Sequence, residues 1–87
     1  MKITITAHAQ KQLKKIPKAY QIMLVQKIKR LSSESNVGSE KVSGYKNYYK
    51  NRVGIYRIVF VQKNNEIEVA LIAHRKEVYL LLKRLFN

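Results

Sequence analysis

Five side chains that could together handle a phosphodiester lie between residues 50 and 79: Lys50, Arg52, Arg57, Arg75 and Tyr79. Reactions at a phosphodiester build up negative charge in the transition state, and fixed positive groups stabilise that charge. Carboxylates for acid/base work are scarce, because the chain has five glutamates and no aspartate. The residue types therefore favour phosphate binding or phosphate chemistry through cations.

The charge balance points the same way. The chain has 18 Lys and Arg residues against 5 acidic ones, for a formal net charge of +13. Such a field favours RNA, DNA, an anionic membrane surface or an acidic protein as partner. Because there is no cysteine, a disulfide framework, a thiolate nucleophile and a zinc knuckle are excluded. Two isolated histidines, His8 and His74, do not make a metal site, so we expect neither a metal nor another cofactor.

Length and apolar runs bound the organisation. Eighty-seven residues make a single domain over residues 1–87. Apolar runs such as residues 22–25 and 78–82 are far too short to span a bilayer. Residues 1–7 lack the continuous apolar stretch of a signal peptide. These features predict a cytoplasmic protein with no membrane association.

The elements that must position the cations begin with a short strand and two helices. Ile3 and Ile5 alternate with polar residues, and Thr6 can then cap a helix. Apolar residues at helical spacing predict two helices separated by Pro17, with Ala9, Leu13 and Ile16 in the first and Tyr20, Leu24, Ile28 and Leu31 in the second. Together these two helices form a hairpin.

A polar loop over residues 32–44 precedes three predicted strands at residues 45–53, 56–63 and 66–73. Turns at Gly54 and at Asn64-Asn65 join these strands, since asparagine tolerates the positive φ of a tight hairpin turn. Apolar residues from Val78 onward recur at helical spacing and predict a last helix. The order β-α-α-β-β-β-α predicts an α+β fold, in which an antiparallel sheet carries helices on one face: the N-terminal helical hairpin and the C-terminal helix.

Strand geometry predicts how the cations are arranged. Alternation places Lys46, Tyr48, Lys50 and Arg52 on one face, about 7 Å apart per two residues, a spacing suited to a nucleic acid backbone. Arg57 joins this face from the next strand. Lys46, Tyr48 and Lys76 are the candidate RNA-binding residues around the candidate catalytic set.

The last helix contributes a further pair. Arg75 and Tyr79 are i, i+4 neighbours and present together, and a phosphate near this helix start would meet a favourable dipole. His74 is a possible proton carrier. The same residues also fit plainer interpretations: a solvated cationic sheet face, a packed Tyr79 and a histidine that ends a strand.

Three segments resemble the RelE/ParE toxin superfamily. They are residues 12–17, residues 44–58 with the G-x-Y-R pattern at 54–57, and residues 74–79 with the H-R-x-x-V-Y pattern. The resemblance covers nearly the whole chain. The chain differs from the family pattern in three places. Relatives often have an acidic residue where this chain has Ile55, and usually an aliphatic residue where it has Asn51. The segment before the last helix is short, so one basic position found in some RelE members has no counterpart.

The resemblance implies the toxin of a type II toxin–antitoxin system. RelE-type members cut mRNA in the ribosomal A site without a metal. The resemblance therefore implies three partners: the ribosome with its 16S rRNA, mRNA, and a RelB-like acidic or apolar antitoxin peptide. By position, these residues match the family's basic pair (Lys50 and Arg52), the arginine of its tyrosine-arginine pair (Arg57), a basic residue before the last helix (Arg75) and its C-terminal tyrosine (Tyr79). From the chemistry of RNA cleavage we then expect Lys50 to be the base, Arg52 and Arg57 to clamp the phosphate, Arg75 to steady the leaving side, and Tyr79 to orient the ribose or stack on a base. His74 substitutes for the general acid that the short segment leaves without a counterpart.

Two other functions remain open at the level of the sequence. A ParE-like toxin has the same fold and inhibits DNA gyrase, although that branch generally lacks the full basic-plus-tyrosine set. A non-catalytic nucleic-acid-binding module driven by net charge would show steep salt dependence and no cut product.

Overall fold

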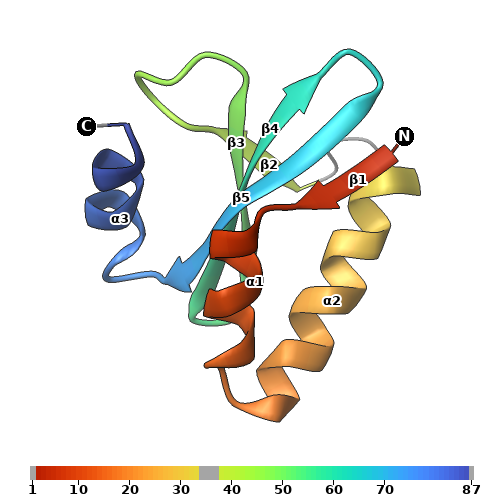
Figure 1. Ribbon diagram of the computed structural model, residues 1–87, viewed down its shortest axis with the longest axis vertical. Coiled ribbons are helices and arrows are strands. Elements are labelled where there is room, and N and C mark those ends of the chain that lie inside the picture. The colour runs from red at the N-terminus through yellow and green to blue at the C-terminus, as the bar shows by residue number, and fades with distance from the viewer. Residues whose placement is uncertain (1, 34–37, 87) are drawn as a thin grey trace.

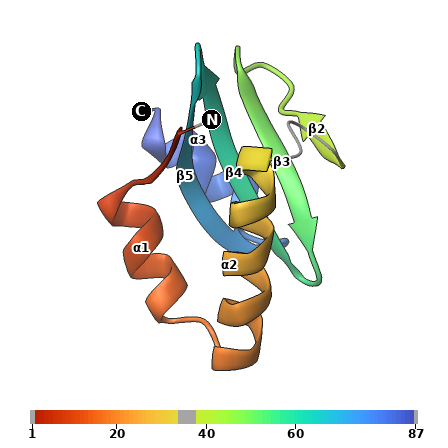
Figure 2. The same cartoon turned by 90° about the vertical axis from the view of Figure 1, so that its right-hand side faces the viewer.

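The computed structural model describes residues 2–33 and 38–86, which form a five-stranded sheet with helices on both faces (Figures 1 and 2). Along the chain the elements are β1 (Lys2–Ile5), α1 (Ala7–Lys14), α2 (Lys18–Ser33), β2 (Ser39–Lys41), β3 (Tyr48–Val53), β4 (Tyr56–Lys63), β5 (Glu66–His74) and α3 (Val78–Leu85). The strand order is β1-β5-β4-β3-β2. The predicted α+β class and the predicted helix order are confirmed.

The sheet is mixed, whereas an antiparallel sheet was predicted. β1 runs parallel to β5, with Ile3 opposite Ile67, and the other neighbouring strands are antiparallel. A parallel pair needs a long crossover, and the chain from α1 to β4 supplies it. Alternation in β1 predicted a strand but held no information about its partner.

A short edge strand, β2, lies where a loop over residues 32–44 was predicted. Ser39 pairs with Asn51 and Lys41 with Tyr49 of β3. The segment Ser-Glu-Lys is too short and too polar to show strand alternation, so its pairing comes from the neighbouring β3 alone. Residues 34–37 of the predicted loop lie outside the described residues.

β3 begins at Tyr48, three residues later than predicted. Gly44 has φ +84° and Asn47 has φ +64°, and left-handed backbone of this kind interrupts an extended strand. Lys46 therefore lies in the turn before β3 and not on its cationic face, which corrects the prediction for this residue.

The helices cover both faces of the sheet, so the prediction of helices on one face alone is wrong for α3. Leu24 and Ile28 of α2 pack with Ile58 and Phe60 on one face. On the other face, a second buried cluster joins Val59, Leu71, Ala73, Val78 and Leu82. Figure 2 shows α3 behind the sheet and α1 and α2 in front of it. The continuous apolar runs of β4 and β5 fit strands that are buried on both sides.

Local signals for capping and turns are confirmed. The Thr6 hydroxyl accepts a hydrogen bond from the Ala9 amide at 3.1 Å and caps α1 as predicted. Asn64 takes φ +41° in the turn between β4 and β5. Among the residues that the structure describes, no helix is long and apolar enough to cross a membrane.

The β3–β4 turn generates a test of the fold. Gly54 has φ +59°, and a Cβ there would lie 3.2 Å from Cε1 of Tyr20, whereas Gly44 has φ +84° and open space around it. We expect Gly54→Ala to lower the free energy of unfolding by more than the roughly 1–2 kcal/mol of a left-handed alanine, because Tyr20 must also move. Gly44→Ala is the matched control and should show the backbone strain alone. Urea denaturation measures both, and an equal or smaller loss for Gly54→Ala would contradict the close approach of Tyr20.

Candidate active site

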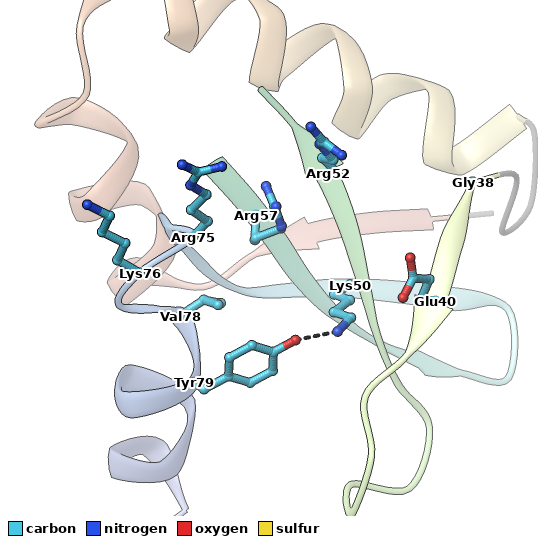
Figure 3. A pocket seen from close by; sticks show the side chains of 9 residues that line it. All are labelled: Gly38, Glu40, Lys50, Arg52, Arg57, Arg75, Lys76, Val78 and Tyr79. Carbon is cyan, nitrogen blue, oxygen red and sulfur yellow. Dashed lines mark hydrogen bonds between the residues drawn. The ribbon is translucent and has the colours of Figure 1, made fainter. Parts of the chain in front are cut away.

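An open cavity of about 490 Å³ lies between β2, β3, β4 and the start of α3 (Figure 3). Its lining combines cations with one tyrosine and one carboxylate: Gly38, Glu40, Lys50, Arg52, Arg57, Arg75, Lys76, Val78 and Tyr79. The structure therefore brings together all five residues that the sequence singled out for chemistry. Lys76, a candidate RNA-binding residue, lies at the same cavity.

The β3–β4 hairpin positions three of the cations. Arg52 lies directly opposite Arg57 in the ladder, and Lys50 lies opposite Val59, which packs beneath α3. The Arg57 Nη1 donates hydrogen bonds to the carbonyl oxygens of Gly54 at 3.1 Å and Tyr56 at 2.9 Å. Since a guanidinium carries five N–H donors, this anchor fixes the group and leaves donors for a phosphate.

The segment after β5 is fastened to the same hairpin. The Arg75 amide donates to the carbonyl of Ile55 at 2.7 Å, which places Arg75 beside the β3–β4 turn. Val78 is 2% exposed and anchors the first turn of α3 on the sheet, while the adjacent Tyr79 is 56% exposed. The side chain of Tyr79 therefore projects into the cavity and not into the core (Figure 3).

Lys50 and Tyr79 meet across the cavity. The Lys50 Nζ donates a hydrogen bond to the Tyr79 hydroxyl, and Nζ lies 5.0 Å from the centroid of the tyrosine ring. This contact joins β3 to α3 (Figure 3). It places an amine next to a hydroxyl that can both donate and accept a hydrogen bond.

Glu40 is a residue that the sequence did not predict at the site. It lies on β2 directly opposite Lys50 and is the one carboxylate among the lining residues of the cavity. The strand that holds it is secured from the other face, where the Asn51 side chain, 2% exposed, donates to the Ser39 hydroxyl at 3.0 Å. That bond explains why a polar Asn51 occupies an inward position. The inward-facing Asn51, which needs a polar partner, was the only signal in the sequence for a strand beside β3 and therefore for the position of Glu40.

Three predicted site residues lie elsewhere. Lys46 is in the turn before β3, and the Tyr48 ring packs 5.1 Å from Phe86 in an aromatic group beside α3. The His74 ring lies 6.0 Å from the Tyr56 ring, its Nδ1 accepts the Lys76 amide at 3.1 Å, and it lines a different cavity. None of the three lines the cationic cavity, because turn geometry or ring packing directs each side chain away from it.

The cavity has a strong preference for anions on physical grounds. It gathers five cationic side chains against the single carboxylate of Glu40, and like charges held this close repel one another until an anion enters. Nowhere in residues 2–33 and 38–86 do three His, Cys, Asp or Glu side chains gather as a metal site. The lining offers amines, guanidinium groups, a phenol and a carboxylate to a bound phosphodiester.

Comparison with known proteins identifies the class. The structure is similar to a chain of the RelB–RelE antitoxin–toxin complex from Methanococcus jannaschii, with 28% identity, a TM-score of 0.75 and coverage of 90% of this chain and 96% of that one. It is also similar to the isolated E. coli RelE toxin (21% identity, TM-score 0.74, 97% of each chain) and to a chain of the chromosomal ParDE system of P. aeruginosa (19%, 0.70, 85% and 95%). No curated protein gives a significant sequence match.

The fold is thus that of the RelE/ParE toxin superfamily. The sequence model described as "ParE toxin of type II toxin-antitoxin system, parDE" matches residues 3–79. The chain belongs to this family of type II toxin–antitoxin toxins, and an antitoxin is its partner class.

The cationic cavity generates a test that does not depend on any reaction. We expect inorganic tripolyphosphate to raise the melting temperature of the protein, because a ligand at tenfold its Kd stabilises the folded state by about 1.4 kcal/mol. Arg57→Ala should remove most of this rise. Lys11→Ala, which removes a cation from the exposed side of α1, is the matched control and should retain it. An equal rise in all three proteins, measured by differential scanning calorimetry, would mean that the anion binds by net charge and not in the cavity.

Proposed function

We propose that this toxin is a metal-independent endoribonuclease that cuts mRNA in the ribosomal A site and thereby inhibits translation. The observation that carries the proposal is the convergence of Lys50, Arg52, Arg57, Arg75 and Tyr79 on one open cavity. The resemblance to RelE-type toxins supplies the ribosome, its 16S rRNA and mRNA as the setting. Action in the cytoplasm follows from that setting.

The reaction uses a nucleophile that RNA itself carries, the 2′-hydroxyl. A base removes its proton, the oxygen attacks the adjacent phosphorus, and the bond to the 5′ oxygen of the next nucleotide breaks as that oxygen gains a proton. Negative charge grows on the phosphate during this sequence, so preorganised cations stabilise the transition state more than the ground state. Arg52 and Arg57 hold the phosphate, and Arg75 lies on the leaving side.

Two groups in the cavity are able to serve as the base. Lys50 is the first candidate, since its amine contacts the Tyr79 hydroxyl and lines the cavity. Glu40 is the second, because it lies opposite Lys50 and is a carboxylate in reach of the same bound ribose. Tyr79 orients the ribose through its hydroxyl or stacks on the base through its exposed ring.

The antitoxin partner should be complementary to this surface. A peptide with acidic and apolar residues would cover the cationic cavity and neutralise or displace the start of α3. Such a segment would prevent Arg57 from binding the phosphate and Tyr79 from contacting the RNA. Similar toxins from M. jannaschii and E. coli are found in complexes with RelB antitoxins.

The family description also supports a second function, inhibition of DNA gyrase, because the matching model is that of ParE toxins. A supercoiling assay with purified gyrase separates the two functions. The nuclease proposal predicts undisturbed supercoiling and cut mRNA in a translation reaction, whereas blocked supercoiling with intact mRNA would favour the ParE function.

The clamp residues give the first functional test. Arg57→Ala should lower ribosome-dependent mRNA cleavage about 10²- to 10³-fold, as loss of one preorganised donor does. Tyr79→Phe keeps the ring and loses one hydrogen bond, so we expect about a tenfold loss. Primer extension on mRNA from a purified translation system measures both, with Lys11→Ala as the control expected within about twofold of the unmodified toxin. Full activity in both site variants would overturn the proposal.

A second pair of variants identifies the base. Lys50→Arg keeps the positive charge, but arginine does not give up its proton in proteins, so loss of a lysine base should lower the single-turnover rate by about 10² or more. Glu40→Gln keeps the shape of the side chain and should leave that rate within a few-fold if Lys50 is the base. The reverse pattern, an active Lys50→Arg with an inactive Glu40→Gln, would assign proton removal to Glu40.

A further inference from the structure

A second cationic hollow, of about 300 Å³, lies between α2 and the end of β3. It carries three cations and no carboxylate, with Met23, Gln26, Lys27, Arg30, Arg52, Val53 and Gly54 as its lining. Lys27 and Arg30 lie three residues apart on α2 and so occupy the same side of the helix. Of these three cations, Arg52 has a role in the reaction proposed above, whereas Lys27 and Arg30 have none.

Arg52 belongs to both hollows. It lines the cationic cavity described above, which the proposed function makes the catalytic cavity, and it also lines this second hollow. The pairing of β2 with β3 ends at Asn51, so Arg52 lies at an edge of the sheet that β2 leaves uncovered. In Figure 3 its guanidinium points toward α2 and away from Lys50. A chain of phosphates that leaves the catalytic cavity over this edge would meet Arg52 first.

Lys27 lines the second hollow and also lies close to the first. Its Nζ lies 3.9 Å from the position that a Cβ on Gly38 would occupy, and Gly38 lines the catalytic cavity. Lys27 itself lines the second hollow. Arg57 and Arg52 thus line the first cavity, and Arg52, Lys27 and Arg30 line the second, so the two hollows share Arg52.

We propose that the second hollow binds a backbone phosphate of the same RNA strand whose scissile phosphate lies in the catalytic cavity. Single strands are commonly held by a positive groove that follows their backbone, and such phosphate contacts set the register of the strand without reading its sequence. The site rests on the proposed nuclease function. It assigns Lys27 and Arg30 to strand positioning, and it requires RNA longer than the segment that fills the catalytic cavity. RNA is favoured over an acidic peptide because Arg52 makes the hollow continuous with the site of the reacting phosphate.

Binding of RNA of two lengths tests the site. The probes are 2′-O-methyl oligouridylates, which lack the nucleophile and stay intact: a trinucleotide and a strand of about twelve nucleotides, within the range that single-strand grooves bind. The double variant Lys27→Gln/Arg30→Gln should weaken binding of the longer strand about tenfold or more and leave the trinucleotide unchanged. The slope of log K against log salt for the longer strand should become shallower by about 0.7 for each phosphate that the variant no longer neutralises. Fluorescence anisotropy measures both quantities.

A matched control lies on the same helix. Lys18→Gln/Lys29→Gln removes the same charge from α2 beside Ile22 and Val25, a surface that has no part in either cationic hollow. It should leave the length dependence intact. Equal reductions in affinity in the two double variants would mean that α2 attracts RNA by net charge alone and would overturn the site. An oligoglutamate peptide is the second probe. If Lys27→Gln/Arg30→Gln lowered the affinity for this peptide and left the affinity for the longer RNA unchanged, the hollow would fit an acidic protein segment, and the RNA site would be overturned.

The outcomes separate this site from the proposed function. A toxin that binds longer RNA through Lys27 and Arg30 but leaves translated mRNA intact contradicts the nuclease function and keeps the binding site. In the opposite case, the toxin cuts mRNA, but its Lys27→Gln/Arg30→Gln variant binds both RNA lengths as tightly as the unmodified protein. That result supports the nuclease function and excludes the binding site.

Discussion

The site depends on one electrostatic constraint, the placement of Arg52 directly opposite Arg57 in the β3–β4 ladder. Like charges at opposed positions destabilise a sheet by several tenths of a kcal/mol, so the apolar packing of β4 on both faces must offset the repulsion. The backbone bond from Arg75 to Ile55 adds a third guanidinium to the same place. In the proposed function, a bound phosphate would relieve this repulsion, and the fold would hold its cations in place for the charge that grows during the reaction.

Much of this arrangement could be predicted from the sequence because it is local. The two-residue loop at Gly54 sets the register of the hairpin, and that register alone places Lys50, Arg52 and Arg57 on one face. The i, i+4 spacing predicted that Arg75 and Tyr79 would present together, and both line the cavity. Arg75 does so for another reason, because α3 begins only at Val78 and the backbone bond to Ile55 places Arg75. Short-range geometry therefore accounts for the three cations of the hairpin, and a tertiary contact adds Arg75.

The features that the sequence did not predict are those fixed by tertiary contacts. The apolar stripe of α3 indicates a buried helix but does not say which face of the sheet it covers. Glu40 reaches the cavity only because β2 adds to the edge of β3, a pairing secured by Asn51 and invisible in three polar residues. His74 was a chemically reasonable proton carrier, yet packing against Tyr56 directs its ring to another cavity. The type of a residue limits the chemistry of its side chain, whereas tertiary packing determines which cavity the side chain lines.

The central claim is that the cavity between the β3–β4 hairpin and α3 holds the scissile phosphate. The most direct measurement is a structure of the toxin on a ribosome whose A-site codon carries 2′-O-methyl groups, which leave the mRNA uncut. The account predicts a phosphate of that codon within hydrogen-bonding distance of the side chains of Arg57 and Tyr79, with Lys50 or Glu40 facing the blocked 2′ oxygen. A codon that contacts the α1–α2 surface or the aromatic group around Tyr48, with the cationic cavity facing away from the mRNA, would contradict it.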